Sequence, residues 1–151
     1  MSGLISQKVV ASKAGTIRDM LSQIRTLPLK SEEEFLADVH MVAAGESYLR
    51  RALEALLDWG RHVLAKGFGR PVAEYKRIPP ALREVGVLSA EGERRMLDMA
   101  GYRNRMVHFY DEITPTELYG ILTAHLTDVD AVVAELRTWL NANPDRVNST
   151  L

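Results

Sequence analysis

The chain has 151 residues, no cysteine, 19 Lys plus Arg against 20 Asp plus Glu, and 46% apolar residues. This length suits one domain, 1–151, whose core needs no disulfide or metal to hold it, since about 68–70% of the unfolded surface is buried at this size. The absence of cysteine excludes a disulfide framework, a thiolate metal site and a cysteine nucleophile. No apolar run reaches the ~18–20 residues of a membrane span and the start lacks a signal-peptide core, so we expect a cytoplasmic protein without membrane contact.

Apolar residues recur at helical spacing along almost the whole chain, and no stretch alternates with period two. The pattern predicts a first helix over about residues 4–26, which ends before Pro28. A second helix begins at the capping box of Ser31 and runs to about Lys66. At ~1.5 Å per residue it would be about 54 Å long, so we expect it to bend or break, at Gly45.

The C-terminal half contains the other predicted helices, which cover 81–85, about 90–109, and about 114–141. The two longer ones start at the caps Ser89 and Thr114. The polar tail, about 142–151, is expected to fray. The sequence therefore predicts an all-α antiparallel bundle of four long helices and one short helix.

The charge is unevenly distributed along the chain. Residues 50–105 contain 12 Lys/Arg and 7 Asp/Glu, a balance of +5, whereas the remainder contains 7 and 13, a balance of −6. A basic middle between acidic ends can present a positive face to phosphates while the whole chain stays near neutral. Chance distribution over helix surfaces explains the same numbers, so the charge alone leaves both interpretations open.

The same basic region ends in a segment, 101–112, that carries two arginines, a histidine and two tyrosines. A histidine exchanges protons near neutral pH, and arginine donates bidentate hydrogen bonds to phosphate oxygens. Cleavage of RNA by its own 2′-hydroxyl needs these two capacities, a group that moves a proton and a cation that neutralises the phosphoryl oxygens, and it needs no metal.

Helical spacing constrains how this segment works. At ~100° per residue, Arg103 and His108 lie about 140° apart, so they do not face each other on a straight helix. Asn104 lies one turn before His108 and is placed to orient its imidazole. A working site therefore requires a distorted helix end or a second chain. We favour a symmetric dimer with these helix ends at the interface.

Arg103-x4-His108-x-Tyr110 matches the R-x4-H-x-Y signature of HepT-type toxins, within the wider HEPN family of ribonucleases. The resemblance covers about residues 30–140 and extends to other positions in order: Asp58-Trp59-Gly60-Arg61-His62, Gly67, Pro71, Tyr75, Gly86-Val87-Leu88, Met99 to Asn104, and Tyr110 to Ile113.

This resemblance implies an all-α homodimer that acts as a metal-independent endoribonuclease on RNA such as tRNA or mRNA. It also implies a partner, an MntA-type minimal nucleotidyltransferase antitoxin that adds AMP to the signature tyrosine, here Tyr110. On a continuous helix Tyr110 shares a stripe with Arg103, so the added phosphates would occupy Arg103 and screen His108.

We accordingly assign Arg103 to phosphate binding and transition-state stabilisation, His108 to general acid–base catalysis, and Tyr110 to modification. Asn104 is predicted to support His108. Further candidates for contacts with the RNA backbone are Arg105, Lys66, Arg70, Lys76 and Arg77. No His-x3-His or carboxylate cluster has metal-ligand spacing, so no metal or cofactor is expected.

Asp58 and His62, four residues apart, are interpreted mainly as a structural pair and secondarily as part of a site. Two alternatives to the enzyme stay open at this point. One is a non-catalytic helical module that holds nucleotide or substrate for a nucleotidyltransferase. The other is a purely structural bundle, in which Arg103 and His108 only make interface bonds.

Overall fold

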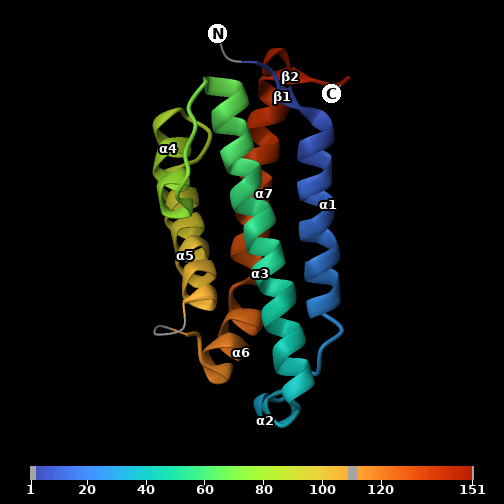
Figure 1. Cartoon of the computed structure of the whole chain (residues 1–151). Coiled ribbons are helices and arrows are strands. Elements are labelled where there is room, and N and C mark those ends of the chain that lie inside the picture. The colour runs from blue at the N-terminus through green and yellow to red at the C-terminus, as the bar shows by residue number, and fades with distance from the viewer. Residues whose placement is uncertain (1–2, 109–111, 151) are drawn as a thin grey trace.

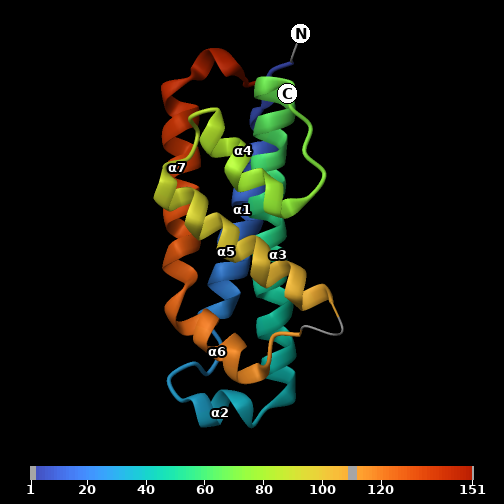
Figure 2. The same cartoon turned by 90° about the vertical axis from the view of Figure 1, so that its left-hand side faces the viewer.

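The computed structural model describes residues 3–108 and 112–150 of the chain. Three long helices, α1 (Gln7–Ile24), α3 (Val39–His62) and α7 (Leu126–Ala142), run side by side along the molecule (Figure 1). The fourth, α5 (Ala90–Val107), crosses α3 obliquely on one flank and packs beside the short α4 (Ile78–Glu84), as Figure 2 shows. The predicted all-α class and the four long helices are confirmed.

Shorter elements close the two ends of the bundle. At one end lie α2 (Glu32–Leu36) and α6 (Pro115–Ala124), and at the other lie strands β1 (Ile5–Ser6) and β2 (Val147–Asn148) (Figure 1). The π-helix η1 (Val63–Gly67) continues α3, and the 3-10 helices η2 (Tyr75–Arg77) and η3 (Pro144–Arg146) precede α4 and β2.

One continuous apolar core fixes these helices against each other. Its largest fully buried side chains are those of Trp59, Phe35, Ile5, Ile24, Leu49, Leu53, Leu56, Leu57, Leu64, Ile78, Leu82 and Met96. Gly60 of α3 is a point of close approach, because a Cβ there would lie 2.9 Å from side-chain atoms of both Ile78 and Leu82 and 3.1 Å from Met96 Cε. The missing side chain lets α4 and α5 pack tightly on α3.

The second predicted helix breaks at Asp38 and not at Gly45. Asp38 has extended backbone angles (φ −113°, ψ 104°), and its carboxylate accepts from the backbone N–H groups of His40 and Met41, so it caps α3. Gly45 lies buried inside the unbroken helix. A Cβ at that position would lie 2.9 Å from Leu122 Cδ1, so Gly45 serves the packing of α6 on α3.

The last predicted helix is also divided. Helix α6 ends at Ala124, and α7 starts at Leu126, with His125 (φ −118°, ψ 2°) between them. The apolar periodicity continues through this break, so the pattern gives no sign of it. The short predicted helix starts three residues earlier than expected, at Ile78, because Pro79 and Pro80 both fit in its first turn.

The expected frayed tail is instead folded over most of its length. Val147 and Asn148 pair in parallel with Ile5 and Ser6, and the Arg146 guanidinium donates to the Gly67 carbonyl at 2.5 Å. Ile5 is fully buried, so its strand needs a hydrogen-bonding partner away from water. The strand from the other terminus supplies that partner.

Candidate active site

Helix α5 ends at Val107, one residue before the predicted catalytic histidine. His108 has extended backbone angles (φ −105°, ψ 120°), so the helix does not continue through it. The 140° offset expected between Arg103 and His108 therefore does not apply. The structure thus has an interrupted helix end, the first of the two alternatives, and the second chain stays a prediction.

Arg103 and His108 line one open groove. Three parts of the chain form it: α3, the segment that leads into α4, and the end of α5. The lining residues are Arg61, Ala73, Glu74, Tyr75, Lys76, Arg103, Asn104 and His108. Three of these side chains are permanent cations at neutral pH and one is a carboxylate, and Glu54 and Asp58 pair with Arg103 and Arg61 behind the lining. The unused N–H donors of the two arginines and the Lys76 ammonium can bind an anion such as a phosphodiester.

Arg103 makes two hydrogen bonds, and its guanidinium carbon lies over an aromatic ring. Its Nε donates to Glu54 Oε2 at 2.9 Å, and Nη1 donates to Asn104 Oδ1 at 3.4 Å. The guanidinium carbon lies 4.7 Å from the centre of the Tyr75 ring. A guanidinium carries five N–H donors, so these two bonds leave donors for a ligand in the groove.

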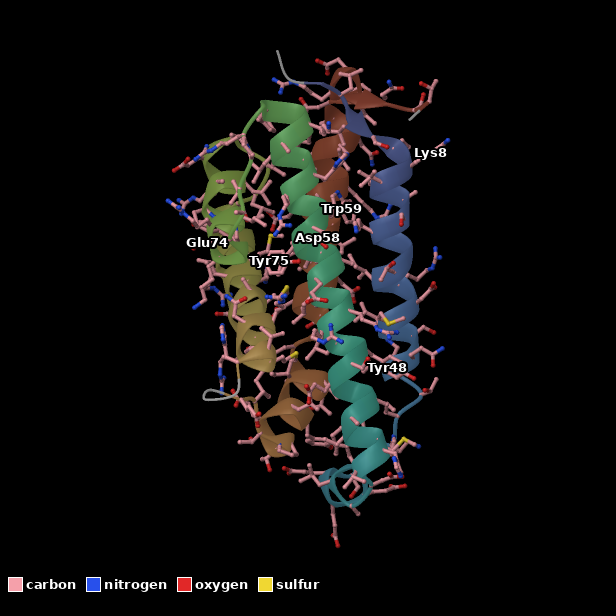
Figure 3. The ribbon with its side chains drawn as sticks, in the orientation of Figure 1. Lys8, Tyr48, Asp58, Trp59, Glu74 and Tyr75 are labelled. Atoms are coloured by element: carbon pink, nitrogen blue, oxygen red, sulfur yellow. The ribbon has the colours of Figure 1, made fainter. Side chains whose placement is uncertain are left out.

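Tyr75 connects the groove wall to α3. Its hydroxyl donates to Asp58 Oδ1 at 2.8 Å, and its ring lies 4.8 Å from the guanidinium carbon of Arg61 (Figure 3). Burial, followed by the bond to Asp58, raises the pKa of Tyr75 to about 12. The phenol therefore stays protonated throughout the neutral range and cannot serve as a base there.

Of the two supporting residues next to Arg103 that the sequence predicts, one lies in the groove and the other does not. Asn104 lies in the groove but bonds to Arg103, and its predicted role in orienting His108 stays a prediction. Arg105 points elsewhere and forms a bidentate pair with Glu117, with Nη2 2.8 Å from Oε1. That hydrogen-bonded pair lowers the pKa of Glu117. Arg105 is thus engaged in joining α5 to α6.

The other basic candidates lie at different distances from the site. Lys76 lines the groove, whereas Arg77 and Arg70 line an adjoining groove that shares the 73–74 segment with the first. Arg70 pairs with Glu84. Lys66 is exposed on η1. Tyr110 lies outside the described residues, so its predicted place on the stripe of Arg103 stays a prediction.

The profile of the protein family described as Ribonuclease HepT-like matches residues 17–136. The chain belongs to this family. Among curated relatives, the tRNA nuclease HepT of Aphanizomenon flos-aquae (strain 2012/KM1/D3) is 22% identical over 140 residues, which are 90% of this chain and 92% of that protein.

Solved structures share the fold of this HepT-like chain. The tri-AMPylated Shewanella oneidensis HEPN toxin, solved in complex with its MNT antitoxin, superposes with a TM-score of 0.78 at 18% identity, covering 86% of this chain and 97% of that one. YutE, a cytosolic protein of unknown function from Bacillus subtilis, superposes with a TM-score of 0.76 at 18% identity over 95% of each chain.

The sequence analysis missed the contacts that build the HepT-like site around Arg103. Glu54 was not singled out and Tyr75 was noted only as a shared position, whereas Asp58 was interpreted mainly as the partner of His62 and secondarily as part of a site. A usable signal was present: Glu54 and Asp58 lie four residues apart on one face of a helix inside the basic segment, where their carboxylates are suited to pair with arginines.

The structural pair expected between Asp58 and His62 is wrong. Asp58 accepts from Tyr75, whereas His62 Nε2 accepts from the backbone N–H of Ser6 at 2.9 Å. Burial, with smaller effects from Lys66 and Lys13, lowers the pKa of His62. His62 therefore acts as a neutral acceptor that fastens β1 to α3.

The described residues offer neither a metal-binding cluster nor a membrane-spanning helix. Within 3–108 and 112–150, no group of three or more His, Asp or Glu side chains is arranged to hold a metal ion. No helix in the same ranges is both long and apolar enough to cross a membrane.

Proposed function

We propose that this HepT-like chain is a toxin that cleaves RNA as a metal-independent endoribonuclease in the cytoplasm. The observation that carries the proposal is the groove in which Arg103, Asn104 and His108 come together beside Arg61 and Lys76. The groove unites a permanent cation and an acid–base group on one concave surface, which is the minimum that phosphodiester transesterification needs.

In this reaction the 2′-oxygen bonds to phosphorus and the bond from phosphorus to the 5′-oxygen breaks. The products are a 2′,3′-cyclic phosphate and a 5′-hydroxyl end. We assign His108 to proton transfer, away from the attacking 2′-oxygen or onto the departing 5′-oxygen. Arg103 donates to the phosphoryl oxygens, whose negative charge increases in the transition state. Lys76 and Arg77 are assigned to the RNA backbone on either side.

We further propose a homodimer, with the ends of α5 at the interface. Two features of α5 support it. Val107 is 41% exposed although it is apolar, and a Cβ at Gly101 would meet nothing within 4 Å. Both leave room for a second copy beside the groove, where that copy would supply a second acid–base group.

Regulation by a nucleotidyltransferase antitoxin that adds AMP to Tyr110 is part of the same proposal. The AMPylated state and the antitoxin named for the Shewanella structure support it. Tyr110 follows His108 by two residues, so phosphates attached to it would carry negative charge close to the groove. Intact mass should rise by multiples of about 329 Da with the antitoxin and ATP, and Tyr110→Phe should abolish the increase.

The test of the enzyme is cleavage of purified RNA in EDTA by the parent chain, Arg103→Ala and His108→Ala. We expect cleavage by the parent only, with 2′,3′-cyclic phosphate ends. Equal cleavage by all three proteins would show that the site is wrongly assigned. Tight nucleotide binding with intact RNA would instead favour the non-catalytic module, since an open cationic groove also suits a bound nucleotide.

A further inference from the structure

The ring of Tyr75 contacts two cations at once. The guanidinium carbons of Arg61 and Arg103 lie 4.8 Å and 4.7 Å from its centre, both within the range of a cation–π contact. Arg61 belongs to α3 and Arg103 to α5, whereas Tyr75 comes from the 3-10 helix of the connecting segment. The tyrosine is therefore the point at which three separate parts of the chain meet at the groove.

The position of the tyrosine is itself fixed. Its hydroxyl donates to Asp58 at 2.8 Å, and the segment just before it is tied to α3 by the bond from Arg61 Nη2 to the Ala73 carbonyl at 3.1 Å. Asp58 also lies 3.7 Å from Arg61 Nη1, so a carboxylate balances one of the two cations. Glu54 balances the other, 2.9 Å from Arg103 Nε.

A guanidinium anchored through Nε–H can still turn about the axis of that hydrogen bond when the torsions of its aliphatic stem let Cδ move with it. The bond to Asn104 is long, at 3.4 Å, and restrains this rotation weakly. The Tyr75 ring opposes this turn, because the turn would move the guanidinium carbon away from its place 4.7 Å over the π-surface. The direction of the remaining N–H donors toward the groove thus depends on the ring.

We propose that Tyr75 is a positioning residue for Arg103. It holds the plane of the guanidinium so that the donors not used by Glu54 and Asn104 point at the phosphate whose bond is cleaved. Tyr75 does not itself transfer a proton. The catalytic part of this inference rests on the proposed ribonuclease function, whereas the ordering of Arg103 can be measured in the free protein.

The experiment compares Tyr75→Phe, which keeps the ring and loses the bond to Asp58, with Tyr75→Leu, which loses both. We expect Tyr75→Leu to lower kcat for RNA cleavage about tenfold with KM within about twofold of the parent, because a cation–π contact is made on the group that stabilises the transition state. Tyr75→Phe should keep kcat within about threefold of the parent, since the π-face remains. Tyr48→Leu, the same change on α3 away from Tyr75 (Figure 3), is the matched control.

The second readout is the ¹⁵N–¹H signal of Arg103 Nε in the free protein, identified by its loss in Arg103→Lys. The heteronuclear NOE of this signal should report an ordered side chain in the parent and in Tyr75→Phe, and a mobile one in Tyr75→Leu. An ordered Arg103 with unchanged kcat in Tyr75→Leu would overturn the proposal. If the parent itself leaves RNA intact, the proposed function fails, and the NMR signal still decides the positioning role.

A third variant covers the case in which Tyr75→Leu does not fold. Tyr75→3,4,5-trifluorophenylalanine keeps the shape of the Tyr75→Phe ring but withdraws electron density from its face, which weakens attraction to a cation. We expect lower Arg103 order and lower kcat than in Tyr75→Phe. Equal values for the two rings would show that Tyr75 only fills space, and the proposal would be rejected.

Discussion

Two histidines at the ends of two helices show how position decides the role of one side chain. His62 is the last residue of α3 and is partly buried. Its Nε2 accepts a hydrogen bond from the backbone N–H of Ser6, which fastens β1 to the bundle. His108 follows α5, is exposed, and lines an open cationic groove. Both lie in basic sequence, so sequence context alone does not separate them. Their surroundings separate them. The His62 ring bonds to a backbone donor and is structural, whereas His108 lines a groove and is the candidate acid–base group.

The largest effect is expected at His108. His108→Ala should lower the rate of RNA cleavage by about 10²–10⁴, because the proton transfer then falls to water. Thermal unfolding should shift little, since the side chain is exposed. His40→Ala, at an exposed position in the first turn of α3, is the control and should cleave at the parent rate. Full activity of His108→Ala would contradict the catalytic role assigned to His108.

A similar contrast separates two arginines on the same helix. Arg103→Ala should lower kcat by about 10²–10³, the cost of losing one donor to a developing charge. Arg105→Ala removes the pair with Glu117 at the surface between α5 and α6, and should cost about 0.2–1 kcal/mol of stability with little change in kcat. Steady-state cleavage and denaturant unfolding measure the two effects. Equal losses of kcat in Arg103→Ala and Arg105→Ala would contradict the assignment of Arg103 to catalysis and of Arg105 to stability.

For His62 the expected effect is on stability. His62→Ala leaves the Ser6 N–H without its acceptor and should cost about 1–3 kcal/mol in the free energy of unfolding. The pKa of His62 is lowered in the folded state, so below pH 6.5 the unfolded chain binds more protons than the folded one. Stability should therefore fall as the pH drops below 6.5 toward the lowered pKa. Urea unfolding at pH 7.5 and 5.5 should show this fall in the parent and a smaller one in His62→Ala.

The smallest effects are expected from the cations beside the groove. Lys76→Gln and Arg77→Gln should each reduce the slope of log(kcat/KM) against log[salt] by about 0.7, the value for one contact with a single-stranded phosphate. Arg94→Gln is the matched control, because Arg94 already lies 3.6 Å from Glu91 and 3.8 Å from Asp98. Unchanged slopes for both groove variants would place the RNA elsewhere on the surface.

Much of the fold was predictable because local signals mark it. The caps Ser31, Ser89 and Thr114 each accept the expected backbone N–H, and Gly86 has the positive φ (83°) of a helix stop. The predictions that failed concern features set by tertiary contacts. Gly45 looks like a break in sequence but serves the approach of α6, and the break at His125 leaves the apolar period intact.

The candidate site was predictable to a similar degree. The segment around Arg103 and His108 contains the residue types that the chemistry needs, and both line the groove. The partners of Arg103 come from 49 and 28 positions away in the chain, at Glu54 and Tyr75, so no local pattern reveals them. No glycine or proline marks the end of α5 at Val107, so the sequence pattern predicts a helix that continues to about residue 109.

The central claim is that Arg103 and His108 act together on one phosphate. The most direct test is a double-mutant cycle in EDTA, in which RNA cleavage is measured for the parent, Arg103→Ala, His108→Ala and the double variant. Residues that act together in one step give non-additive losses of activity. The double variant should therefore be about as active as whichever single variant is less active. Losses that multiply in the double variant would show two independent contributions and would contradict the claim.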